Sequence, residues 1–455
     1  MVTPKVSAAV LRFLSREEGG ITALSLQVFM ASLVLGGLAL DFGNGVASKT
    51  QLQVAADAAA HAAIYTRELR SPEEAKAAAL QIAALNMPGG KYGNVLTTED
   101  IKFGRWKPDT QVFTVDDANA RDAVMVAVKR HKAKGNGVST YLLGLVGFTA
   151  WDVTSETVFE TYYPTCFREG FVAQDRVDMQ SNGHFTSGFC IHSQNHVSVS
   201  SNNTFEPGVV VSMPDKRDIE LPSSGFTSNT GLQPALRDGS YQIRILNRID
   251  DIIRGIETDP FDPQVGIMAQ GSQYYRSYIT NASPVTIKAQ GATSLDSAKF
   301  KTGRIHVMDC KNDQSHKQIG AGFSLVNMVL VTDCRLQFAA GAVIENAVIV
   351  TKNTDPKSFY ASSDIVIGKD DNCAEGGDVQ MVTLGGVEFA AKVNIYGSQI
   401  LAAGDISMTA NADGIEGVAL VSGGKLDVTS NGAFGFCDGA GMNNNYAAAY
   451  FRLAR

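Results

Sequence analysis

The chain has 455 residues, of which 44% are hydrophobic and 19% are charged, so it can bury a substantial core and is not intrinsically disordered. The length suits two or three domains. A formal net charge of −7, without a segment dense in arginine and lysine, excludes nucleic acid as an expected partner.

The first predicted element is a helix made from the uncharged apolar block Ile21 to Leu40. The 20 residues of this block would form a helix of about 30 Å, which matches the hydrocarbon core of a bilayer. A cleaved secretory signal has a shorter apolar core that ends at a small-x-small site. Gly45 to Ala47 has that spacing but lies beyond Asp41. We therefore expect an uncleaved transmembrane helix over residues 19–41, with a buried soluble helix as the alternative.

Basic residues flank the apolar block unevenly. Three precede it: Lys5, Arg12 and Arg16. In the 15 residues after it, Lys49 is the single basic residue. Positive charge favours the cytoplasmic side of a membrane. Residues 1–18 are thus predicted to be cytoplasmic, and the bulk of the chain periplasmic or at the cell surface.

Beyond Asp41, small and apolar residues continue at helical spacing: Leu52, Ala55, Ala56, Ala59, Ala63 and Ile64. This pattern predicts that the helix leaves the membrane as a stalk with a narrow face of small residues. The face is expected to pack on its own domain, and a neighbouring subunit is the alternative.

The stretch from Phe13 to Ala63 resembles the N-terminal signature of the TadE/TadG-type proteins of the Flp (tight adherence) pilus-assembly system. The shared features are an Arg/Glu-Gly boundary, an apolar span, an aspartate at its end and a Leu-Gln-x-Ala-Ala-Asp-Ala-Ala run. The signature residues are Gly20, Asp41, Leu52, Gln53, Ala55, Ala56, Asp57, Ala58 and Ala59. The resemblance implies a single-pass protein of the bacterial inner membrane that contacts other pilus-assembly or pseudopilin-like membrane proteins.

Some members of this family are processed like prepilins, at a glycine followed by an apolar run with glutamate at the fifth position. Counting from Gly19 reaches Leu24, and counting from Gly20 reaches Ser25. Because that glutamate is missing, an uncleaved anchor is expected.

Residues 42–165 are predicted to form the stalk helix and a small pilin-like α+β domain. Ser71 followed by Pro72 and two glutamates predicts the start of a second helix, which ends near Met87. Four segments with strand-like alternation then predict an antiparallel sheet: 101–106, 111–115, 123–131 and 151–160.

The region 166–455 repeats short strand-like segments rich in Gly and Asn. The run at Gly404 aligns with the run at Gly424, 20 residues later, and the run at Asn327 aligns with that at Asn346. Such a period predicts a β-solenoid resembling a parallel β-helix, with a β-sandwich as the alternative. Isoleucines at helical spacing predict a helical insertion over 231–258, with Ile243, Leu246, Ile249, Ile252, Ile253 and Ile256 on one face.

All six cysteines lie in this region: Cys166, Cys190, Cys310, Cys334, Cys373 and Cys437. None is close enough to another for a zinc or dithiol motif, so an even number in an exported region favours disulfides. Two pairs are 24 residues apart, about one coil, and we expect pairing in chain order among the fifteen connectivities that six cysteines allow.

Candidate sites for chemistry are weak, and no catalytic residue, metal ligand or cofactor is predicted. His192 and His196 have a metal-like spacing, but they lie in a strand-and-turn segment. Asp405 begins a run similar to a metal-adhesion motif, yet the repeat 20 residues later lacks the aspartate. Three carboxylates could serve a polysaccharide-active β-helix enzyme: Asp370, Asp371 and Asp438.

The sequence therefore predicts a non-enzymatic, membrane-anchored component of a Flp/Tad-type pilus-assembly apparatus that acts through protein-protein contacts in surface adhesion. Its expected partners are pilus-assembly proteins and the lipid bilayer. The alternatives are an adhesin that binds a surface glycan through the solenoid and, third, a polysaccharide-active β-helix enzyme.

Overall fold

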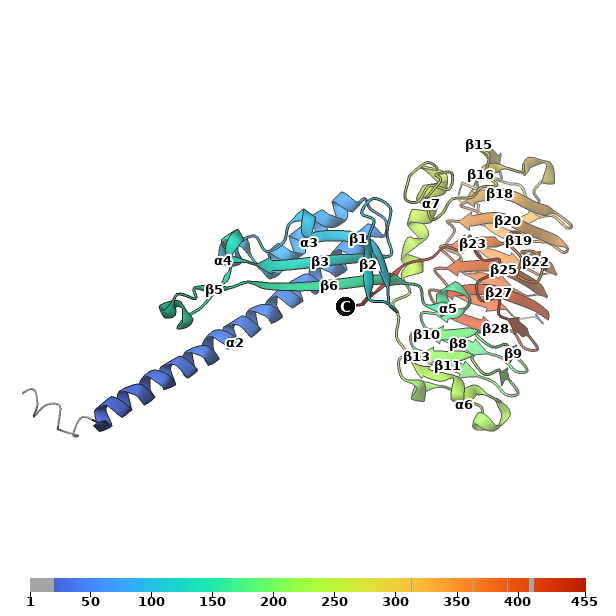
Figure 1. The fold of residues 1–455 in the computed structure, drawn as a ribbon. Helices are drawn as coiled ribbons and strands as arrows, with labels where there is room; N and C mark the ends of the chain where they lie inside the picture. The colour runs from blue at the N-terminus through green and yellow to red at the C-terminus, as the bar shows by residue number, and fades with distance from the viewer. Residues whose placement is uncertain (1–19, 312, 363, 391, 409–412) are drawn as a thin grey trace, which may run out of the picture. The chain divides into compact units, whose positions relative to one another are not determined.

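The computed structural model describes residues 20–455, except for residues 312, 363, 391 and 409–412 (Figure 1). The predictions about the cytoplasmic residues 1–18 and about Gly19 lie outside the described residues. The described chain forms two compact units. Unit 1 contains residues 20–162 and the last five residues, Phe451–Arg455, whereas unit 2 is the segment Tyr163–Tyr450 between them.

Unit 1 begins with the helix α2 (Gly20–Arg67), which is 48 residues long. Among the described residues it is the one helix long and apolar enough to cross a membrane. Large apolar side chains are exposed along its first half, from Ile21 at 80% to Leu40 at 63% and Phe42 at 68%. In Figure 1 this half of the blue helix extends past the end of the unit's sheet.

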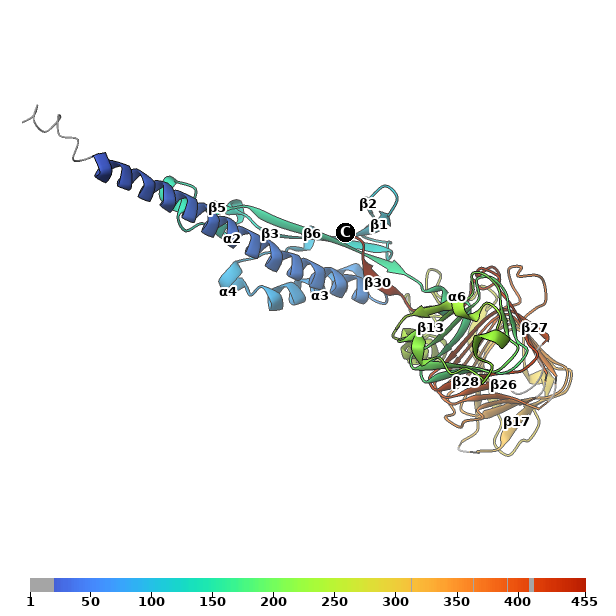
Figure 2. The same cartoon turned by 90° about the horizontal axis from the view of Figure 1, so that it is seen from below.

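The second half of α2 packs against α3 (Pro72–Asn86) and against the sheet, and Figure 2 shows α3 lying alongside it. The predicted start of α3 is confirmed by a capping box, in which Glu74 N donates to Ser71 Oγ and Ser71 N donates to Glu74 Oε2. Short helical turns follow: α4 (Gly89–Tyr92), η2 (Thr98–Asp100), η3 (Lys132–Lys134) and η4 (Leu143–Val146).

The sheet of unit 1 has the strand order β2-β1-β3-β6-β30. Its strands are β1 (Ile101–Lys107), β2 (Val112–Val115), β3 (Ala123–Arg130), β6 (Val153–Tyr162) and β30 (Tyr450–Leu453). The pairs β1–β2, β1–β3 and β3–β6 are antiparallel, as the sequence predicts. The chain end returns to this sheet, where Ala454 N donates to Val158 O and Val158 N donates to Arg455 O, each at 2.8 Å. A small hairpin joins β4 (Val138–Ser139) to β5 (Ala150–Trp151).

Unit 2 is dominated by two sheets of parallel strands. The larger has 15 strands: β7 (Gly170–Ala173), β9 (His184–Phe185), β10 (Cys190–Ser193), β12 (Thr204–Phe205), β13 (Val210–Met213), β14 (Leu236–Asp238), β15 (Asn281–Lys288), β16 (Arg304–Asp309), β18 (Ser324–Thr332), β20 (Ala342–Thr351), β22 (Ile365–Ile367), β23 (Val379–Thr383), β25 (Val393–Ala402), β27 (Asp413–Ser422) and β29 (Ala433–Gly435). The smaller has eight: β8 (Arg176–Met179), β11 (His196–Val199), β17 (His316–Ile319), β19 (Arg335–Phe338), β21 (Phe359–Ala361), β24 (Val387–Phe389), β26 (Ile406–Met408) and β28 (Lys425–Val428). Figure 1 shows the strands of unit 2 stacked as a ladder.

The internal repeats of the sequence correspond to neighbouring strands. Ile406 of β26 pairs with Leu426 of β28, and Met328 of β18 pairs with Ala347 of β20. Because equal positions of successive repeats lie side by side, their apolar residues form continuous buried rows that a single repeat could not bury.

The order of the strands in the ladder differs from their order in the chain. From β7 the chain proceeds outward through β10 and β13 to β14. It restarts at the other end of the ladder with β15 and proceeds back to β27, which pairs with β7 through Leu420 and Phe171. Unit 2 is thus two arms joined where its first strand, β7, pairs with its last long strand, β27.

The core of unit 2 is one cluster of buried side chains that runs through both arms. At their junction the rings of Phe434 and Phe185 stack with centroids 4.7 Å apart. Phe171 meets Phe434 edge to face at 5.2 Å.

The segment 231–258 is not one continuous helix. It contains α6 (Leu232–Ala235), then β14, then η7 (Arg244–Arg248) and α7 (Ile249–Glu257). The predicted face of isoleucines is buried at Ile249, Ile252 and Ile256. Helical periodicity therefore correctly predicted the C-terminal part of this segment. After Pro234 the chain instead extends the parallel sheet, where Leu236 pairs with Val211. The remaining short helices are α5 (Thr165–Arg168), η5 (Lys216–Asp218), η6 (Gly225–Ser228) and η8 (Ser297–Lys299).

Candidate functional site

The signature residue Asp41 is buried at the point where the apolar half of α2 ends. Its carboxylate accepts hydrogen bonds from the backbone N–H groups of Tyr141, Leu142 and Leu143, at 2.5, 3.1 and 2.7 Å. These groups lead into η4, whose first N–H groups lack partners within the turn. Asp41 thus caps a turn that is about 100 residues away in the chain and attaches it to α2.

The alanine run of the signature forms the buried face of α2. Leu52, Ala55, Ala56 and Ala59 are each 0% exposed. They pack with Ala75, Ala79 and Ala83 of α3 and with strand residues of unit 1, among others. Small side chains allow this close approach of two helices, so the face packs on its own unit, as expected.

The remaining signature residues lie on other faces of α2. Gln53 Nε2 donates to Asp57 Oδ1 at 2.8 Å, which is a helical i,i+4 pair on a half-buried surface. Ala58 is half-buried, and Gly20 is exposed at the start of the described helix. The signature thus combines a clamp at Asp41 with a packing face.

Three disulfides hold unit 2 together: Cys166–Cys190, Cys310–Cys334 and Cys373–Cys437. Two of them close loops with sequence separations of 24, and the third has a separation of 64. Each therefore joins two segments of unit 2 that the backbone connects only through intervening strands.

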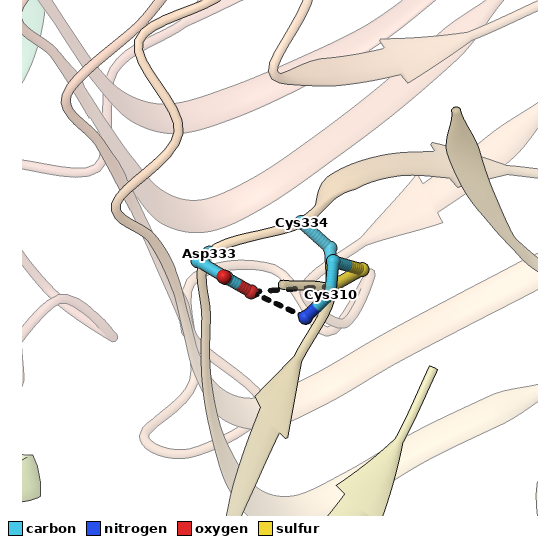
Figure 3. A group of neighbouring side chains, drawn as sticks. All are labelled: Cys310, Asp333 and Cys334. Atoms are coloured by element: carbon cyan, nitrogen blue, oxygen red, sulfur yellow. Dashed lines mark hydrogen bonds between the residues drawn. A yellow bond between two sulfur atoms is a disulfide. The ribbon is translucent and has the colours of Figure 1, made fainter. Parts of the chain in front are cut away.

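Side chains able to ligate a metal gather in groups of three at two places in the described chain, and both groups include two disulfide-bonded cysteines. Figure 3 shows one of these groups, in which Asp333 lies beside the disulfide between Cys310 and Cys334. Asp333 Oδ1 accepts a hydrogen bond from Cys310 N at 2.7 Å. A sulfur in a disulfide offers no thiolate to a metal. Asp333 thus supports the disulfide loop.

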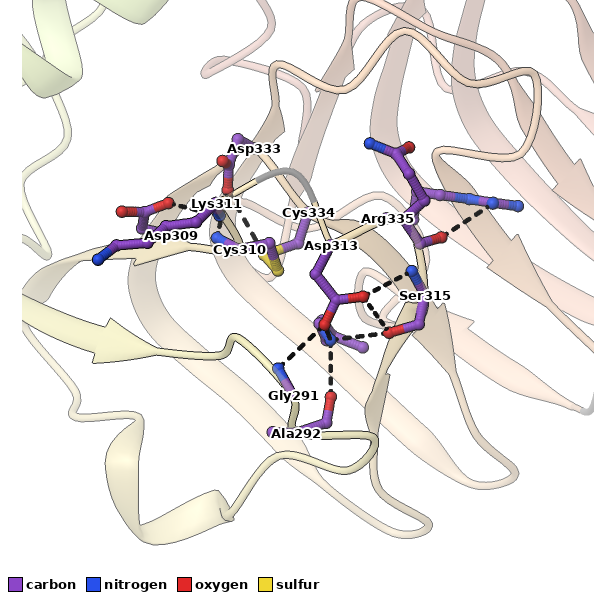
Figure 4. A network of polar contacts seen from close by, with 12 residues as sticks. Gly291, Ala292, Asp309, Cys310, Lys311, Asp313, Ser315, Asp333, Cys334 and Arg335 are labelled. Carbon is purple, nitrogen blue, oxygen red and sulfur yellow. Dashed lines mark hydrogen bonds and ion pairs between the residues drawn. A yellow bond between two sulfur atoms is a disulfide. The ribbon is translucent and has the colours of Figure 1, made fainter.

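A buried lysine near this disulfide was not identified from the sequence. Lys317 lies at an inward position of β17 and is 0% exposed. Its Nζ donates to Asp313 Oδ2 at 2.6 Å and to Ala292 O and Ser315 Oγ at 2.8 Å. Asp313 also accepts from Gly291 N and from Ser315 (Figure 4). The hydrogen bond from Lys317 is the main reason that the pKa of Asp313 lies well below its usual range.

The network satisfies all three protons of the buried ammonium. One sequence signal could have revealed this buried lysine. Lys317 occupies a position whose partner in the next strand is the apolar Leu336.

A second buried charged group, Glu169, is also absent from the sequence predictions. Its carboxylate accepts from Cys437 N at 2.5 Å and from Gly439 N at 2.9 Å. Burial raises the pKa of Glu169 despite these two donors. It connects the start of unit 2 to the loop that carries the third disulfide.

The residues weighed for chemistry lie in separate places. His192 is on β10 of the larger sheet and His196 on β11 of the smaller one, so they share no helical face. Asp405 Oδ1 accepts from Lys425 N at 2.7 Å, which links the start of β26 to the start of β28 in the next repeat.

The acidic candidates lie in two loops that the disulfide Cys373–Cys437 joins. Asp370 and Asp438 are exposed, and Asp371 Oδ1 accepts from Ala374 N in its own turn at 3.0 Å. These are ordinary roles for aspartates in turns.

Comparison with protein families identifies both parts of the chain. A family described as putative Flp pilus-assembly TadE/G-like matches residues 19–79, and one described as putative Tad-like Flp pilus-assembly matches residues 58–158. The N-terminal region is Tad-like. The resemblance predicted from the signature is therefore confirmed, and it indicates a role in pilus assembly.

A third family, a domain of unknown function (DUF7867), matches residues 170–438, which is more than half of the chain. The chain belongs to this family. The DUF7867 match begins with β7 and ends next to Cys437, so it contains both parallel sheets of unit 2. No curated protein and no solved structure matches the chain.

The Tad-like matches contain Asp41 and the alanine face of α2, together with α3 and the strands β1 to β3. The Tad-like region and the DUF7867 domain thus correspond to different units. The family indicates a non-enzymatic role for the Tad-like region.

Proposed function

We propose that the chain is a non-enzymatic, membrane-anchored component of a Flp/Tad-type pilus-assembly apparatus. The observation that carries the proposal is the division of α2 into two halves within one Tad-like region. Its first half exposes apolar side chains, and its second half buries a small-residue face in unit 1. Exposed leucines and phenylalanines along a whole helical half are costly in water but stable in lipid.

The anchor is a single pass in the bacterial inner membrane, formed by the first half of α2, with the N-terminus in the cytoplasm. The rest of unit 1 and the whole of unit 2 lie in the periplasm or at the cell surface. The three disulfides support this side of the membrane, because disulfides persist in oxidising compartments. The partners are other pilus-assembly or pseudopilin-like membrane proteins, which unit 1 contacts beside the membrane.

Unit 2 is proposed to be a β-solenoid that provides a rigid surface for protein-protein contacts in adhesion. The parallel pairing of successive repeats and the buried rows between the two sheets support this assignment. The apolar interior serves packing, which leaves the outer surface for recognition.

The decisive measurement is the mass of the native mature chain after separation of inner membrane, periplasm and sheared surface material. An uncleaved chain in the inner membrane that co-purifies with pilus proteins supports the proposal. A chain that begins near Ser48 and is recovered in soluble or surface material contradicts it and favours a secreted adhesin. Retention on glycan without turnover supports that adhesin, whereas turnover abolished by Asp370→Ala and Asp371→Ala indicates an enzyme.

A further inference from the structure

The loop between β4 and β5 lies beside the last turn of the apolar half of α2. Asp41 holds its backbone through three hydrogen bonds, and Asn44 Nδ2 donates to Ser139 O at 2.9 Å. At Gly37 the approach is so close that a Cβ atom there would lie 2.7 Å from Leu142 Cβ. Gly37, Asp41 and Asn44 have helical spacing, so one face of α2 receives the loop.

The loop carries no charge, and its two ends are exposed. Its sequence from Tyr141 to Phe148 is YLLGLVGF, without a charge. Tyr141 is 69% exposed and Phe148 is 38% exposed. An uncharged loop with exposed aromatic rings is unusual for a surface in contact with water.

Residues at the base of the loop have the composition of a membrane interface. The ring of Trp151 meets Phe148 edge to face, with centroids 4.7 Å apart. Lys132 Nζ lies 4.6 Å from the centroid of Phe148. Tryptophan, tyrosine and lysine with an apolar stem are enriched where the hydrocarbon core meets the headgroups.

We propose that the loop Tyr141–Phe148 is a second membrane-contacting element, which inserts Tyr141 and Phe148 into the bilayer interface beside α2. The occupant is lipid because the exposed apolar surface of α2 continues without interruption to the residues that hold the loop: Leu38 is 44% exposed and Leu40 is 63% exposed. A bilayer that covers these leucines reaches the depth of the loop. This inference rests on the proposal that α2 spans the membrane.

The hydrogen bonds of Asp41 give this arrangement a physical reason. A carboxylate and three backbone N–H groups would each be expensive to place in hydrocarbon without partners. Because they satisfy one another, the loop and the end of the span can lie at the interface without bound water.

The test is quenching of tryptophan fluorescence by brominated lipids, with the full chain reconstituted in phosphatidylcholine/phosphatidylglycerol vesicles. The chain contains two tryptophans, Trp106 and Trp151. In the loop probe, Phe148→Trp is combined with Trp106→Phe and Trp151→Phe, which preserves an aromatic pair. In the span probe, Met30→Trp replaces an exposed residue of the apolar half in the same background. The negative control retains Trp106 and carries Trp151→Phe.

We expect lipids brominated near the headgroups to quench the loop probe by about half or more, as for a residue at the interface. Lipids brominated near the bilayer centre should quench the span probe more strongly than they quench the loop probe. The Trp106 control should stay unquenched by both kinds of lipid. A quenched span probe with an unquenched loop probe overturns the inference alone, and indicates that water or another protein covers the loop. If neither probe is quenched, the membrane-spanning role of α2 fails as well.

Discussion

The carboxylate of Asp41 accepts a hydrogen bond from Leu143 N at 2.7 Å, across a sequence separation of 102 residues. Asp41 ends the apolar half of a helix, and Leu143 begins a turn in a hairpin loop. The signature aspartate therefore organises tertiary structure at the end of the predicted span.

Replacing Asp41 by asparagine should loosen the hairpin loop. Asparagine keeps one acceptor oxygen but places an amide N–H₂ against backbone donors, so at least one hydrogen bond is lost. We expect amide hydrogen exchange in residues 140–150 to accelerate about tenfold or more in detergent-solubilised protein. The matched control is Asp57→Asn, which changes the pair with Gln53 and should leave the loop unaffected. Equal exchange in both variants would refute the clamp.

Enlarging the buried alanine face should destabilise unit 1. Ala59 is 0% exposed, so Ala59→Leu forces three additional carbon atoms between tightly packed elements at a cost of about 1–3 kcal/mol. Both tryptophans lie in unit 1, so their fluorescence during urea unfolding reports on this unit. The neighbouring Ala58→Leu, at a half-buried position, should have a much smaller effect.

Removing the last five residues, Phe451–Arg455, should also destabilise unit 1. Three backbone hydrogen bonds with Val158 disappear, which costs about 3 kcal/mol. Phe451 additionally packs near the rings of His61 and Tyr65, with centroids 6.1 and 6.0 Å away. The tryptophan unfolding transition should move to lower urea, and the control Leu453→Ala, which changes a 54% exposed side chain, should not move it. An unchanged transition in the truncated chain would show that the strand is dispensable.

Truncating Phe434 should weaken the junction of the two arms in unit 2. Its side chain is 0% exposed and contacts Phe185 and Phe171, so Phe434→Ala should cost about 3–5 kcal/mol. Hydrogen exchange of the β7 and β27 amides measures the loss where the arms pair. Phe261→Ala is the matched control, since Phe261 is 61% exposed.

Unit 2 should lose stability as the pH falls from about 6.5 towards 4, because burial lowers the pKa of His192 to about 4. The unfolded chain binds a proton near pH 6.5 whereas the folded unit does not, so acid favours unfolding in this window. The full loss is about 3 kcal/mol below pH 4.

His192→Gln should remove this pH-dependent part of the stability, as measured by the difference in unfolding free energy between variant and parent across the window. The raised pKa of Glu169 acts in the opposite sense, since that contribution to stability declines as the pH rises. It is present in both proteins and cancels in the difference. His196→Gln, at a half-buried histidine, is the control. Parallel profiles of unfolding free energy against pH for the parent and the His192→Gln variant would contradict the predicted role of His192.

Local patterns predicted much of the structure. The capping box at Ser71 and Glu74 involves residues three apart, so it is readable from the chain alone. The repeats aligned in the sequence correspond to paired strands, as for Ile406 and Leu426, because in-register stacking places equal repeat positions side by side. Periodicity was less reliable over 231–258, where strand pairing of Leu236 with Val211 replaced the expected helix.

The candidate site was predicted only in part. The signature drew attention to Asp41, but its partners at 141–143 have no sequence feature that points to a carboxylate. Lys317 and Glu169 were missed for a similar reason, since burial and the donors and acceptors around a charge depend on distant segments.

By itself, the sequence determined the apolar span, the small-residue face, the Tad-like signature and the repeat of unit 2, because each depends on the spacing of residue types along one segment. Only the tertiary structure decided that Arg455 returns to Val158, that β27 pairs with β7, and that Asp41 caps a distant turn. These contacts join segments that are far apart in the chain. They form because edge strands and buried polar groups need hydrogen-bond partners, and the folded chain brings those partners within reach.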